Sequence, residues 1–146
     1  MNFIKALDIS ANGLYAQKKK MEVISQNIAN ADTLVTENGE PYRKKRAVIT
    51  ENDMTNQFNK VLDNFSQPLK GEGVKVDITT PLEDPFKLLY DPDHPLANEN
   101  GYVRMPNVDT TEEMLEMMSA TRAYEANATV MDATKSMFQK AMEIMK

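Results

Sequence analysis

The sequence predicts a mainly α-helical fold in which two long terminal helices pair as an antiparallel coiled coil, with a small, irregular, strand-containing middle region. Heptad-spaced apolar residues occur at both ends of the chain, over residues 3–31 and 111–145. All seven prolines and four of the five glycines lie between them, in residues 32–109. Because proline and glycine interrupt helices, we expect helix at the two ends and turns or short strands in the middle.

Composition fits one small domain and narrows the class of protein. The 146 residues carry a formal net charge of −5, include eleven methionines and contain no cysteine. Disulfides and thiolate metal sites are therefore impossible, and the acidic balance argues against nucleic acid as the main partner. No apolar run approaches the ~20 residues of a membrane span, and no cleavable signal peptide is visible. Methionine-rich surfaces suit packing against more than one partner.

Residues 1–31 are predicted to form the N-terminal helix. Leu7, Leu14, Met21 and Ile28 recur every seven positions, and a companion row is interrupted by Ser10 and Gln17. A second apolar stripe on another face indicates contact on two sides of this helix. The residues expected to pack against other molecules are Phe3, Leu7, Ile9, Leu14, Met21, Val23, Ile24, Asn27, Ile28 and Asn30.

The middle region, residues 32–109, is predicted to contain short strands and turns. Asn38-Gly39 is a tight-turn signal. Three segments favour extended structure, namely residues 41–50, 74–78 and 86–90. Apolar spacing also allows a short helix over residues 53–65.

Residues 110–146 are predicted to form the C-terminal helix, beginning with a capping box from Thr110 to Glu113. One heptad row starts at Met117 and recurs every seven residues, and a companion row contains Met114, Thr121, Ala128, Lys135 and Met142. A further row gives this helix a wider apolar face than a two-stranded coiled coil needs. The residues expected to pack against other molecules are Met114, Met117, Tyr124, Asn127, Val130, Met131, Met137, Phe138, Met142 and Met145.

Motifs for catalysis or cofactor binding are not found. His94 is the only histidine and lies beside two aspartates, but a proline-locked turn is favoured over a metal or acid–base site because no second histidine or cysteine exists. Lys18–Lys20 and Arg43–Arg46 could bind an anionic surface, although a solvated helix face and a charged strand edge are the favoured interpretations. We therefore expect no catalytic residue, no cofactor and no metal.

The terminal apolar rows have two interpretations. Amphipathic helices ordinarily cover the core of their own chain, and periodicity alone slightly favours that. Their placement at both ends, the interrupted rows and the methionine-rich face instead favour packing between molecules, which builds a helical filament when the contacts do not close into a ring.

Several stretches are distinctive when taken together: Ala6–Leu14 with Ser25–Ala31; Pro41–Arg43; Tyr90–Pro95 with Gly101–Val103 and Pro106–Val108; and Glu113–Met114 with Arg122–Asn127. They resemble the flagellar axial proteins, the family of rod and hook subunits. The Asp-Pro-Asp-His-Pro block at residues 91–95 is most similar to the proximal-rod members of that family.

The resemblance implies a non-enzymatic subunit of the basal-body proximal rod, assembling through its terminal helices into the shaft that carries motor torque to the hook and filament. Implied partners are copies of itself, other rod subunits, proteins at the junction of rod base and export gate, and the type III export apparatus in transit. The implied location is the rod in the periplasmic space, reached without signal cleavage. Alternatives are another axial rod or hook subunit, or a helical adaptor on a membrane surface.

Asn27 and Asn30 share one helix face because they are three residues apart. We expect their amides to hydrogen-bond across a subunit boundary or to cap the helix end; simple tolerance of asparagine at a fraying helix end is the alternative.

Overall fold

The computed structural model describes residues 3–51, 74–81 and 86–144. Along the chain its elements are α1 (Phe3–Ala29), β1 (Arg46–Glu51), β2 (Val74–Thr79), β3 (Phe86–Tyr90), β4 (Tyr102–Pro106) and α3 (Thr110–Ile144). The strands predicted within residues 41–50, 74–78 and 86–90 are confirmed, whereas β4 was not predicted. The short helix expected over residues 53–65 and the side chain of Met145 lie outside the described residues.

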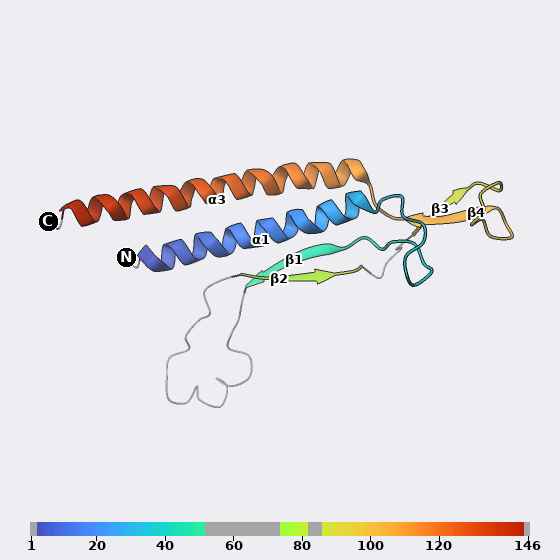
Figure 1. Ribbon diagram of the computed structural model, residues 1–146, viewed down its shortest axis with the longest axis horizontal. Coiled ribbons are helices and arrows are strands. Elements are labelled where there is room, and N and C mark those ends of the chain that lie inside the picture. Colours follow the sequence, from blue (N-terminus) through green and yellow to red (C-terminus); the bar gives the residue numbers. More distant parts are fainter. Residues whose placement is uncertain (1–2, 52–73, 82–85, 145–146) are drawn as a thin grey trace, which may run out of the picture.

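The two long helices lie side by side and run in opposite directions, so that both chain ends are found at one end of an elongated molecule (Figure 1). This confirms the predicted class, mainly α with a small strand-containing middle. The strands form two separate antiparallel pairs, β1 with β2 and β3 with β4. The first pair lies along α1, and the second lies at the end of the molecule opposite the termini (Figure 1).

Small and polar residues line the seam between α1 and α3. A Cβ atom placed on Gly13 would lie only 2.9 Å from Nδ2 of Asn127, so the helices approach closely there. Ala16 and Ala120 are almost completely buried. The α3 positions in this seam recur every seven residues, and they are Glu113, Ala120, Asn127, Thr134 and Ala141.

The companion row predicted for α3, which starts at Met114, does not lie in this seam. Met114, Thr121, Lys135 and Met142 are exposed, and only Ala128 of that row is half-buried. The physical reason is that close helix approach selects small side chains, and buried polar ones that find partners, rather than the most hydrophobic ones. A pattern search based on hydrophobicity passes over such positions.

Asp109, rather than Thr110, is the N-cap of α3. Its Oδ1 accepts hydrogen bonds from the backbone N–H groups of Thr111 at 2.9 Å and Glu112 at 3.2 Å. These bonds lower the pKa of Asp109, as expected for a carboxylate at the positive end of a helix. The predicted capping box from Thr110 to Glu113 was wrong because the Glu113 side chain turns into the protein instead.

The larger buried side chains gather near the end of the hairpin where α1 finishes and α3 begins. They include Val23, Ile24, Asn27, Tyr42 and Glu113. Towards the termini the buried residues are smaller, such as Ser10 and Thr134. Among the described residues no helix is both long enough and apolar enough to cross a bilayer.

Candidate functional site

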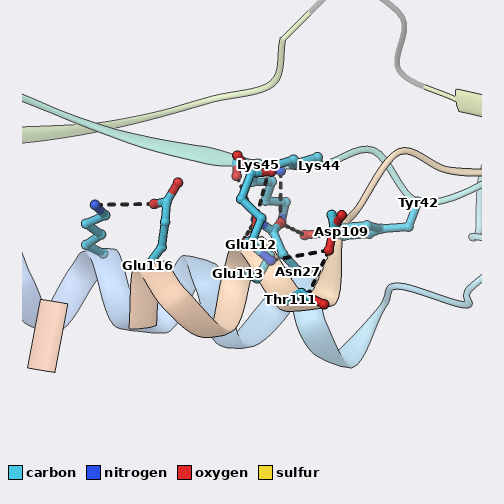
Figure 2. A network of polar contacts seen from close by, with 10 residues as sticks. Asn27, Tyr42, Lys44, Lys45, Asp109, Thr111, Glu112, Glu113 and Glu116 are labelled. Atoms are coloured by element: carbon cyan, nitrogen blue, oxygen red, sulfur yellow. Dashed lines mark hydrogen bonds and ion pairs between the residues drawn. The ribbon is translucent and has the colours of Figure 1, made fainter. Parts of the chain in front are cut away.

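Asn27, near the C-terminal end of α1, is the centre of a buried polar network (Figure 2). Its Nδ2 donates to the backbone carbonyl of Lys45 at 2.9 Å and to Oε2 of Glu113 at 3.0 Å. Its Oδ1 accepts from the backbone N–H of Lys45 and from the hydroxyl of Tyr42, both at 3.0 Å. An amide side chain has two N–H donors and one oxygen with two lone pairs. Every hydrogen-bonding position of Asn27 is thus filled within the chain.

Glu113 completes this network from the first turn of α3. Its side chain is only 2% exposed, and its Oε1 lies 2.8 Å from Nζ of Lys44. Lys44 Nζ also lies 3.2 Å from Oε2 of Glu112. Burial alone would lower the pKa of Lys44, but its hydrogen bonds to Glu113 and Glu112 outweigh burial, and the net effect is a raised pKa. Burial, together with the negative charge of Glu113, raises the pKa of Tyr42.

We call this cluster, made of Asn27, Tyr42, Lys44, Lys45 and Glu113, the Asn27 joint. It ties together the end of α1, the segment that leads into β1 and the start of α3. Among the described residues no buried side-chain nitrogen or oxygen lacks a hydrogen-bond partner. A fully satisfied polar network in a low-dielectric interior holds its members in one arrangement. The structural role of the joint is therefore to hold these three segments in a fixed arrangement.

Asn30 caps the C-terminal end of α1, which was one of the two roles predicted for it. Its backbone N–H and its Nδ2 both donate to the carbonyl of Gln26, at 3.1 and 2.8 Å. Asn27, in contrast, neither caps the helix nor keeps a free hydrogen-bonding position for a neighbouring molecule.

His94 lies in a turn between β3 and β4, as predicted. Its Nδ1 accepts the backbone N–H of Leu96 at 3.1 Å. No group of three histidine, aspartate or glutamate side chains gathers as metal ligands would anywhere in the part of the chain that the structure describes. Within the basic clusters, Lys19, Lys20 and Lys44 form ion pairs with glutamates.

Large apolar side chains on the outside of the helical hairpin form the second candidate site. Leu115 is 64% exposed and Ile144 is 85% exposed. Single exposed apolar side chains are common, but many of them together on one element indicate an interaction surface. We call the exposed apolar side chains of α3, taken together, the outer apolar face; at ~100° per residue they lie on both flanks of the seam and on the side away from it. They are Met114, Leu115, Met118, Tyr124, Val130, Met137, Phe138, Met142 and Ile144. Ile9 and Tyr15 of α1 are also exposed.

The residues predicted to pack against other molecules fall into three groups. Those exposed in the single chain are Ile9, Met114, Tyr124, Val130, Met137, Phe138 and Met142. Those half-buried are Leu7, Leu14, Met21, Ile28, Asn30, Met117, Asn127 and Met131. Val23, Ile24 and Asn27 are buried inside the chain, while the side chains of Phe3 and Met145 lie outside the described residues.

Sequence reasoning missed Leu115 and Met118 of the outer apolar face, and it missed Tyr15 on α1. It also missed the joint as a unit, because Tyr42, Lys44 and Lys45 are distant in sequence from Asn27 and Glu113. A signal for Leu115 and Met118 was present. They are apolar residues outside the heptad rows of a helix that has few large buried positions.

Two family models match the ends of the chain. The model described as flagella basal body rod protein matches residues 7–34, and the model described as flagellar basal body rod FlgEFG protein C-terminal matches residues 99–144. The flagellar basal-body rod protein FlgC of Bacillus subtilis (strain 168) is 43% identical, with all of both chains covered. The chain belongs to the FlgC family of flagellar basal-body rod proteins.

Two further FlgC proteins match over nearly their whole length. That of Borreliella burgdorferi is 39% identical, covering 100% of this chain and 99% of the relative. That of Salmonella typhimurium is 38% identical, covering 99% of this chain and 98% of the relative. As a member of the FlgC family, the chain is a structural subunit of the flagellar basal-body rod and not an enzyme. It assembles with other rod subunits in the basal body.

The two segments matched by the family models supply the two ends of the Asn27 joint. Asn27 lies in the first matched segment and Glu113 in the second. The middle of the chain, between these segments, contributes Tyr42, Lys44 and Lys45 to the same network.

Proposed function

We propose that this FlgC-family chain is a proximal-rod subunit, and that it builds the rod wall by burying its outer apolar face against copies of itself and other rod subunits. The exposure of that face in the single chain carries the proposal. Each large apolar side chain that moves from water to full burial contributes ~1.5–3 kcal/mol. The net free energy of association, after the entropic cost of bringing subunits together, then depends on how many of these side chains are buried against a neighbouring subunit.

The unequal distribution of side chains supports this role. The seam inside the hairpin is built from small residues such as Ala16 and Ala120, while Leu115 and Met137 point outward and are exposed. A protein that functioned alone would place its large side chains inside, because burial of apolar area is the main source of stability. Half-buried residues at the rims of the seam, such as Met117 and Met131, would complete the contact.

The Asn27 joint sets the geometry of this contact in the proposal. By fixing the start of α3 to the end of α1, it holds the outer apolar face in one orientation. Half-buried residues of α1, such as Leu14 and Ile28, would then be presented together with those of α3.

The decisive experiment compares charged substitutions at large apolar positions and at a polar position on the same side of α3. We expect L115D to keep its circular-dichroism spectrum as a purified chain but to be absent from isolated basal bodies, and cells with only this variant should not swim. The matched control is S119D, which places the same charge one helical turn away at an exposed position that is already polar. Incorporation of both L115D and M118D at the level of S119D would refute the proposal.

Transit through the type III export apparatus, without signal cleavage and into the periplasmic rod, is part of the same proposal. Contact with proteins at the junction of rod base and export gate also belongs to it. A narrow seam of small residues supports this route, because helices held by little buried area can separate at low cost. The intact mass of the chain recovered from basal bodies tests it: loss of an N-terminal segment would argue against signal-free export.

The proposal also concerns the free subunit. Because buried residues thin out towards the termini, we expect amide exchange in the free chain to be fast near Leu7 and Ile144 and slow around Asn27. Slow exchange along all of α1 and α3 would contradict the idea that the terminal segments gain order on assembly.

A further inference from the structure

Four methionines of α3 expose more than half of their side chains, and each belongs to the outer apolar face. They are Met114, Met118, Met137 and Met142. At ~100° per residue they do not share one side of the helix, so they are spread over the whole of that face. The chain contains no cysteine, so methionine carries all of its sulfur. Among the described residues, these four are the sulfur-bearing side chains most open to solvent.

Methionines at the seam between α1 and α3 are shielded. Met21 is half-buried, and the hydroxyl of Thr121 lies 3.6 Å from its Sδ. The same hydroxyl donates to the carbonyl of Met117 at 2.8 Å, which holds it beside that sulfur. Met117 and Met131 are also half-buried. The fold thus sorts the methionines into an exposed set on α3 and a shielded set at the seam.

An exposed thioether reacts with peroxides. A sulfur lone pair attacks one oxygen of hydrogen peroxide, the O–O bond breaks and an S–O bond forms. The proton of the transferred oxygen passes to the departing hydroxide, which leaves as water. Sulfur loses two electrons and the peroxide gains them, so that the product is methionine sulfoxide. Because no side chain has to be deprotonated first, the rate depends on access of the peroxide to the sulfur.

Oxidation changes what the outer apolar face can bury. A sulfoxide is polar and its oxygen needs a hydrogen-bond partner, so it disrupts methionine-rich contacts. Four of the nine side chains that define the face would change from apolar to polar. The seam would keep its packing, because buried residues such as Ala16 and Ala120 carry no sulfur. Oxidation should therefore alter how the subunit associates while its helical hairpin stays folded.

We propose that the outer apolar face is an oxidation site, at which a peroxide oxidises the four exposed methionines of the free subunit and so prevents its entry into the rod. The inference rests on the proposed burial of this face between subunits. It adds a chemical condition, namely that the subunit joins only while these sulfurs are reduced. A methionine sulfoxide reductase, with a dithiol as reductant, would return them to thioethers. Once buried between subunits, the same sulfurs would be protected.

The site of reaction is tested on the purified chain in dilute hydrogen peroxide. Tandem mass spectrometry of its peptides measures the sulfoxide at each methionine over time. We expect the four exposed methionines to react several-fold faster than Met21. The matched control is the chain unfolded in urea, where burial is lost and the rates should become alike. Equal rates at Met21 and at the four exposed methionines of the folded chain would overturn the inference.

The consequence for assembly is tested with two fourfold variants. M114Q/M118Q/M137Q/M142Q places an uncharged polar group where each sulfoxide would form, whereas M114L/M118L/M137L/M142L keeps the face apolar at similar volume. Leucine, methionine and glutamine have similar helix propensities, so both purified chains should keep their circular-dichroism spectrum. We expect the leucine variant in isolated basal bodies at the level of the unchanged chain, and we expect the glutamine variant to be absent.

Incorporation of the glutamine variant at the level of the leucine variant overturns the inference. If L115D is excluded in the same experiment, the proposed function still holds. Failure of the proposed function is recognised separately, by normal incorporation of L115D and M118D. Should the glutamine variant lose its spectrum, M118Q is compared with S119Q, which introduces the same side chain at an exposed position that is already polar. Equal incorporation of M118Q and S119Q then overturns the inference.

Discussion

Replacement of Asn27 by alanine should open the Asn27 joint. The substitution deletes two donated and two accepted hydrogen bonds at once, those to Lys45, Glu113 and Tyr42. Each buried polar group left without a partner costs about 1–3 kcal/mol. Lys45 is half-buried, so water can replace part of what its backbone loses, whereas Glu113 and Tyr42 are enclosed. We therefore expect a loss of about 4 kcal/mol, which is a large part of the ~5–15 kcal/mol that stabilises a typical domain.

Amide hydrogen exchange is the appropriate assay, because it reports the opening of each region separately. The expected result for N27A is much faster exchange at the end of α1, at Lys45 and in the first turns of α3. The control is N30A, one helical turn away on the same face, where the side chain makes bonds that are exposed or partly exposed to water. There we expect a change below about 1 kcal/mol.

Equal effects of N27A and N30A, or a change below about 1 kcal/mol for N27A, would refute the reasoning. A double-mutant cycle with Y42F sharpens the test. Because Tyr42 donates to Asn27, the two substitutions should not be additive, with a coupling of roughly 0.5–3 kcal/mol. Additive effects would mean that the network does not act as a unit.

Three further predictions follow from the same contacts. In urea unfolding, G13A alone should be neutral or destabilising. In an N127A background it should stabilise the chain by about 1 kcal/mol, because the clash with the new Cβ atom is gone and the gain in helix propensity remains. Destabilisation in both backgrounds would contradict the close approach of the helices. The pKa of Asp109 in the folded state is lowered from 3.8. Its contribution to stability is therefore present above that value and is lost as pH falls through the folded pKa. Asparagine can still cap the helix but does not titrate, so the melting temperature of D109N should change less between neutral and acidic pH. The pKa values of Tyr42 and Lys44 are raised from 10.0 and 10.5. Their contribution to stability is therefore complete below those values and is lost as pH rises through the pKa values of the folded state. When melting temperature is measured at increasing pH above 10, Y42F should show a smaller decrease than the unchanged chain.

The two terminal helices could be predicted because the helix-breaking proline and glycine residues are concentrated in the middle of the chain, and because apolar residues repeat every seven positions at both ends. Three strands could be predicted because alternation and β-branched residues mark them. β4 was missed because its residues, Tyr102–Pro106, include an arginine and end in proline, and its pairing with β3 depends on a partner that local pattern does not reveal.

The Asn27 joint could not be predicted from periodicity. It depends on polar side chains that become buried only when three distant segments meet, and polar residues on a helix ordinarily indicate a solvated face. The two asparagines were singled out correctly, but sequence spacing could not separate their roles. One turns inward to Glu113 and the other turns back to the carbonyl of Gln26.

The position of the joint at one end of the helical hairpin makes each helix a lever. With 35 residues, α3 extends about 50 Å from its fixed end. A tilt of one degree at the fixed end would therefore displace Ile144 by about 1 Å. Small angular errors at a few buried hydrogen bonds would grow into misalignment of whole side chains at the far tip. The alignment of the far tip would then depend on the stiffness of one asparagine and the groups around it, together with the close seam between the two helices.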